Sequence, residues 1–79
     1  MRLPRDVSGD QVISHLCRNW DYKQVSQVGS HVILVTDSPT HHRIPVPRHR
    51  PLGIGIFKTI LREVCEAKKI TQDVLLRNL

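Results

Sequence analysis

The chain has 79 residues, enough for one hydrophobic core but not two, so we expect residues 1–79 to form a single domain. A domain this small buries only about 60% of its unfolded surface, which excludes an enzyme with a deep interior pocket. Twelve basic and seven acidic residues give a net charge of +5, and the 4% aromatic content argues against a module that stacks several RNA bases on exposed rings.

Residues 8–20 are predicted to form the first helix. Ser8 is placed to cap it, and apolar residues recur with helical spacing at Val12, Ile13, Leu16, Cys17 and Trp20. His15 falls on the opposite, polar face, where we expect an ordinary surface residue. Cys17 and Cys65 lack the close spacing of zinc-binding pairs, so we expect two small, reduced, buried side chains.

Three strands are predicted next, over residues 22–28, 31–36 and 42–46. Gly29-Ser30 allows a tight turn but no crossover helix, so the first two strands must be antiparallel neighbours. The apolar run of the second strand favours a central position. Pro45 and Pro47 cannot donate ladder hydrogen bonds, which places the third strand at an edge of the sheet.

His31 opens the second strand and allows two interpretations. With a two-residue period it shares a face with Ile33 and Val35. If that face packs on the core, His31 is a partly buried structural residue. Otherwise it is the leading candidate for chemistry, because histidine transfers protons at neutral pH and the chain lacks a phosphate-binding loop, a carboxylate pair and a nucleophile triad.

The whole net charge lies in one segment, because no acidic residue occurs between Asp37 and Glu63. Its cations are Arg43, Arg48, Arg50, Lys58 and Arg62, and its histidines are His41, His42 and His49. Such a segment indicates a polyanionic partner, most often nucleic acid, or else a solvated basic surface. The three histidines suit phosphate contacts, a weak metal site or plain solvation, and the sequence does not decide among them.

A loop over residues 48–55 is expected to lead into a second helix that starts at Ile56. A short last helix is expected from Thr71, with Ile70 and Leu75 placed as a hydrophobic staple. The order αβββα with an extra C-terminal helix predicts an α+β fold. Both main helices would cover one face of a three-stranded antiparallel sheet, giving a two-layer domain.

Four stretches resemble the HicA-type mRNA interferase toxins. Gly29-Ser30-His31 resembles the family's G-S-H motif, and residues 42–49 are similar to its H-x-I-x-I-P-x-H stretch. Residues 51–61 resemble its loop and helix start, P-L-x-x-G-T-L-x-x-I-L, and residues 70–76 resemble its last helix. The likeness covers roughly residues 8–79. The chain departs from it at Ile56, where the family has a capping Thr, and over residues 65–69, where many members have a glycine-containing break.

The resemblance implies a double-stranded-RNA-binding-domain-like fold and a metal-independent ribonuclease of a type II toxin–antitoxin pair. It also implies that His31 is catalytic and that a HicB-type antitoxin covers the active face. On this interpretation the residues that contact the mRNA substrate are Ser30, Arg43, Arg48, His49, Arg50 and Lys58. We expect no cofactor, no metal and no membrane segment, and a cytoplasmic protein that is monomeric when free.

The sequence leaves open which group serves as the second proton-transfer partner: water, His49 or a cation. Two other functions also fit the residues, namely a non-catalytic RNA-binding module and a domain whose basic face binds an acidic protein. Cleavage of RNA in the presence of a chelator would separate the ribonuclease from both.

Overall fold

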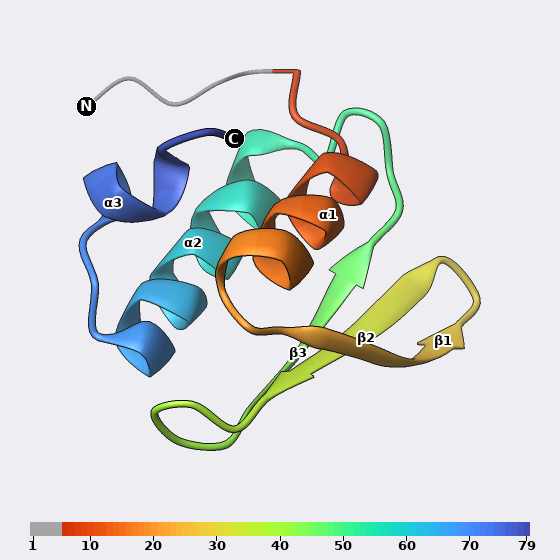
Figure 1. The fold of residues 1–79 in the computed structure, drawn as a ribbon. Coiled ribbons are helices and arrows are strands. Elements are labelled where there is room, and N and C mark those ends of the chain that lie inside the picture. The colour runs from red at the N-terminus through yellow and green to blue at the C-terminus, as the bar shows by residue number, and fades with distance from the viewer. Residues whose placement is uncertain (1–5) are drawn as a thin grey trace.

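The computed structural model describes residues 6–79. In chain order the elements are α1 (Gly9–Asn19), β1 (Lys23–Val28), β2 (His31–Thr36), β3 (His42–Pro47), α2 (Ile54–Lys68) and α3 (Gln72–Leu76). The strands form an antiparallel sheet in the order β1-β2-β3, and α1 and α2 lie on the same side of it (Figure 1). The predicted α+β fold, the central second strand and the edge position of the third are confirmed. None of the helices within residues 6–79 has the length and apolar character needed to cross a membrane.

The first helix begins where the sequence predicts because Ser8 caps it in both directions. The Ser8 hydroxyl accepts a hydrogen bond from the Gln11 N–H at 3.1 Å, and the Gln11 side-chain oxygen accepts one from the Ser8 N–H at 2.8 Å. This capping box satisfies two backbone donors that the helix cannot pair internally. The start of α1 is therefore fixed by local sequence.

The core lies between the sheet and the two long helices. Val32 and Leu34 enter it from β2, and Ile44 and Val46 enter it from β3. Because side chains alternate along a strand, the residues between them point to the outer face of the sheet. His31 lies on that outer face and is exposed, so the interpretation of a partly buried core histidine is wrong.

The second helix starts at Ile54, two residues before the predicted start at Ile56. Gly53 is the N-cap residue with φ +89°, a conformation that favours glycine, and its carbonyl accepts the first helical hydrogen bond from Phe57 at 3.0 Å. No side chain caps this end. Ile56 is the third residue of the helix, so the expectation that a Thr at this position would cap it is wrong. The prediction erred because it assigned Gly55 to the loop, whereas Gly55 lies in the first turn.

The end of α2 is tied to the far end of β2. The Lys68 ammonium donates to the Thr36 hydroxyl at 2.8 Å and to the Ser38 carbonyl at 2.5 Å, and it lies 4.9 Å from the centre of the Tyr22 ring. Burial lowers the pKa of Lys68. The helix then ends at Lys68, and the C-cap residue Lys69 has a left-handed φ of +57°, a conformation that glycine adopts more readily than lysine.

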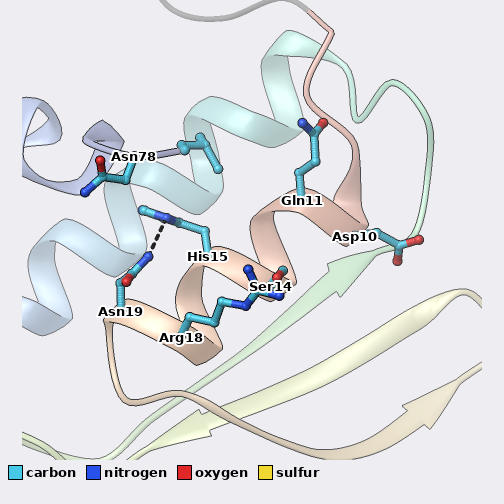
Figure 2. Close-up of a pocket in the computed structure, with 8 residues that line it drawn as sticks. Asp10, Gln11, Ser14, His15, Arg18, Asn19 and Asn78 are labelled. Atoms are coloured by element: carbon cyan, nitrogen blue, oxygen red, sulfur yellow. Dashed lines mark hydrogen bonds between the residues drawn. The ribbon is translucent and has the colours of Figure 1, made fainter.

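His15 is buried, with 7% of its surface exposed, so the expectation of a surface residue is wrong. Its Nε2 lies 2.6 Å from the Leu75 carbonyl, and its Nδ1 lies 3.1 Å from the Asn19 amide nitrogen (Figure 2). His15 thus fastens α3 to α1, and the sequence did not reveal it because its partner is 60 residues away.

Both cysteines are free, as expected, and are half-buried against the core rather than fully enclosed. Burial raises the pKa of the Cys17 and Cys65 thiols. A raised thiol pKa keeps the sulfur protonated and a poor nucleophile.

Candidate active site

Two exposed histidines lie side by side at one end of the sheet. His31 is the first residue of β2, and His49 lies two residues after Pro47, the last residue of β3. Their ring centroids are 6.4 Å apart and the ring planes meet at 69°. Among residues 6–79, the histidine rings that form hydrogen bonds belong to other positions, so both of these rings are free to bind a ligand.

The backbone on either side of His49 is held by two other segments. The Arg48 N–H donates to the Ser30 carbonyl at 2.7 Å, which joins the end of β3 to the turn before His31. The Gly9 N–H donates to the His49 carbonyl at 2.9 Å, which joins the same segment to the start of α1. His49 is therefore placed beside His31 by hydrogen bonds between backbone groups on three separate segments.

Gly9 allows this arrangement because it has no side chain. A Cβ atom at this position would lie 1.8 Å from the Pro47 carbonyl oxygen, far inside any real contact. The helix therefore approaches β3 more closely than any other residue would permit. Sequence reasoning missed Gly9, although a glycine in the first turn of a helix is itself a signal of close backbone approach.

An ion pair spans the same junction. The Arg48 guanidinium donates to both Asp10 carboxylate oxygens, at 2.8 and 3.3 Å, and both side chains are exposed. The hydrogen bond from Arg48 lowers the pKa of Asp10. Arg48 was predicted to hold phosphate, and here part of its guanidinium is occupied by Asp10.

A groove of about 340 Å³ opens beside His31, between the β3 edge of the sheet and α2. Its lining is mostly apolar and carries one carboxylate. The residues that line it are His31, Pro45, Pro47, Gly55, Ile56, Thr59, Ile60 and Glu63. Apart from His31, none of these was predicted as a site residue, because no motif joins them and only the fold brings α2 against this strand edge.

The structure brings together four of the seven predicted site residues: Ser30, His31, Arg48 and His49. Arg50 is exposed in the same loop. Arg43 is exposed on the outer face of the sheet but pairs with Val35, four residues along β2 from His31. Lys58 is exposed on α2 and lines no part of the groove. Neither Arg43 nor Lys58 lines the groove beside His31.

The other two histidines of the basic segment have partners elsewhere. His41 bonds the Asp37 carboxylate at 2.8 Å, and His42 Nδ1 lies 2.8 Å from the Tyr22 hydroxyl. Burial and the charge of Glu63 raise the pKa of Tyr22 to about 12, so this hydroxyl remains a donor. Within the described part of the chain, no three potential ligand side chains are grouped closely enough to hold a metal ion.

Comparison with known protein families assigns the chain to one of them. The family model described as HicA toxin of bacterial toxin-antitoxin matches residues 9–64. The chain belongs to the HicA toxin family. The match runs from Gly9 to within α2 and includes both His31 and His49, so the histidine pair lies inside the part that the family shares. No curated protein and no solved structure matches the chain. As a member of this family, the chain is a toxin of a toxin–antitoxin system.

The contact between Gly9 and β3 yields a first prediction. Gly9→Ala should lower the free energy of unfolding by about 1–3 kcal/mol, because the new Cβ forces α1 and β3 apart. Gly55→Ala is the matched control, since its Cβ would meet nothing within 4 Å and alanine favours the helix by about 1 kcal/mol. Urea denaturation followed by circular dichroism measures both. Equal stability of the Gly9→Ala variant and the native toxin would contradict the close contact.

Proposed function

We propose that this toxin is a metal-independent endoribonuclease that cleaves mRNA, with His31 as a general acid or base. The observation that carries the proposal is the pair of exposed, unengaged imidazole rings 6.4 Å apart at His31 and His49. An acid–base group must come within about 2.6–3.2 Å of the atom that it protonates or deprotonates. Rings this close together can both reach one phosphodiester.

The reaction that fits two imidazoles uses the RNA itself as the nucleophile. One ring takes the proton of the 2′-hydroxyl as this oxygen attacks the adjacent phosphorus. The other ring, protonated, gives its proton to the 5′-oxygen as the bond between that oxygen and phosphorus breaks. The products are a 2′,3′-cyclic phosphate and a free 5′-hydroxyl. Each such proton transfer contributes typically 10²–10⁴-fold to the rate.

Cations and backbone groups around the pair would hold the RNA strand. Arg48 and Arg50 flank His49, and the exposed Ser30 precedes His31. Arg43 on the outer sheet face and Lys58 on α2 would guide the more distant phosphates. Attraction of this kind does not depend on sequence and weakens with salt, because binding releases counterions from the RNA.

The second prediction tests catalysis. His31→Ala should reduce cleavage of RNA at least about 100-fold while the circular dichroism spectrum stays native, because the side chain is exposed. His41→Ala is the matched control, an exposed histidine of the basic segment that is engaged with Asp37. Cleavage by the native toxin should persist in excess EDTA.

Three results would count against this proposal. Full cleavage by the His31→Ala variant would remove the residue from the mechanism. Loss of native cleavage in EDTA, restored by one divalent ion, would replace the mechanism by a metal-dependent one. RNA binding by the native toxin without cleavage would favour the non-catalytic RNA-binding module.

We further propose that the partner of this toxin is an antitoxin of the HicB type that covers the histidine pair. A site that is open at the surface can be shut off by a protein bound over it. The basic residues beside the pair would attract an acidic surface and speed association.

The third prediction follows from this arrangement. Modification of His31 by diethylpyrocarbonate should be at least about tenfold slower in the inhibited complex than in the free toxin. His41, in the turn at the opposite end of β2, serves as the internal reference. Equal reactivity of His31 in the inhibited complex and the free toxin would exclude inhibition by direct cover.

A further inference from the structure

The groove beside His31 has a chemistry that the proposed cleavage does not use. Its walls are the rings of Pro45 and Pro47 and the side chains of Ile56 and Ile60. Its one charged group apart from the histidine is the carboxylate of Glu63. Glu63 is half-buried, and it takes part in neither of the ion pairs found within residues 6–79.

The two ends of the groove carry different groups, with His31 at one end and Glu63 at the other. His31 pairs with Pro47 at the end of β3, and α2 begins soon after this point. At its other end α2 is tied through Lys68 to Thr36, which pairs with the first residue of β3. The helix therefore runs antiparallel to β3, with Gly55 near His31 and Glu63 two turns away. Eight residues of helix correspond to about 12 Å.

A phosphate group does not suit the Glu63 end of this groove. The carboxylate repels it, and none of the lining residues is a lysine or arginine. A flat, mostly apolar ring does suit it, because proline and isoleucine side chains cover the faces of such a ring without needing hydrogen bonds. Gly55 adds no side chain, and a Cβ there would meet nothing within 4 Å, so the entrance beside His31 is open.

We propose that this groove is a nucleobase subsite in which Glu63 selects guanine next to the phosphodiester held at His31. An ionised carboxylate only accepts hydrogen bonds, and its two oxygens match two neighbouring donors. Guanine presents two adjacent donors, N1–H and N2–H, on its Watson–Crick edge. Adenine and cytosine set a ring-nitrogen acceptor beside their amino donor, and uracil sets its one donor between two carbonyl acceptors. The inference rests on the proposed ribonuclease only for its placement next to the scissile bond.

Cleavage-site mapping on an RNA of balanced composition gives the first test. The native toxin should cleave next to guanine in excess, and Glu63→Gln should reduce that preference about tenfold or more while cleavage next to other bases continues. Glu66→Gln is the matched control, because it makes the same charge change on an exposed residue of α2 outside the groove. An unchanged base preference in the Glu63→Gln variant would overturn the proposal.

A binding measurement separates this inference from the ribonuclease proposal. Guanosine monophosphate added to the His31→Ala variant should shift the backbone amide signals of Ile56, Thr59 and Glu63, and the other three nucleoside monophosphates should do so at least about fivefold more weakly. This result would support the subsite even if the native toxin cut no RNA. Cleavage of RNA by the native toxin, with no guanosine monophosphate bound in the groove, would uphold the ribonuclease and overturn the subsite.

Discussion

The arrangement of the candidate site depends on how closely the start of α1 approaches the end of β3. Gly9 donates its N–H to the His49 carbonyl, and its missing side chain leaves room for the Pro47 carbonyl oxygen. The bond from Arg48 to Ser30 then fixes the same segment to the turn before β2. These backbone contacts place two exposed imidazoles together without any hydrogen bond between the rings.

The charges around the pair are divided between two tasks. In the proposed ribonuclease the arginines next to His49 would attract the polyanionic RNA strand, although Arg48 shares its guanidinium with Asp10. The carboxylate of Glu63 lies in the apolar groove, away from these arginines. An RNA strand bound in this way would have its phosphate beside the imidazoles of His31 and His49 and its base beside the Glu63 carboxylate. In this proposal the basic residues attract the RNA, and Glu63 selects the base.

The fold followed from the sequence wherever local signals were strong. Ser8, the turn at Gly29-Ser30 and the prolines of the third strand predicted the first helix, the hairpin and the sheet edge, and all were confirmed. The error at the start of α2 arose from Gly55. This residue lies in the helix, but the low helix propensity of glycine does not predict that. The prediction placed His15 on the surface because its hydrogen-bond partner, Leu75, lies in a helix that is distant in the sequence.

The candidate site was only partly predictable for the same reason. The G-S-H motif pointed to His31. The two-residue period of the strand could not decide whether His31 faces the core or the solvent, and the structure decided it by placing Val32 and Leu34 in the core. The nearness of His49 depends on tertiary contacts at Gly9, and no spacing along the chain encodes it. The groove requires α2 to lie along the edge of β3, which follows from the packing of the whole domain.

The central claim is that His31 and His49 share the two proton transfers on one phosphodiester. RNA with sulfur in place of the bridging 5′-oxygen tests it most directly, because a thiolate leaves without a general acid. We predict that His49→Ala and His31→Ala are both strongly impaired on the oxygen substrate, and that only one of them recovers on the sulfur substrate. That variant lacks the acid, and the other lacks the base. Recovery of neither variant, or native activity of the His49→Ala variant on the oxygen substrate, would contradict the two-histidine mechanism.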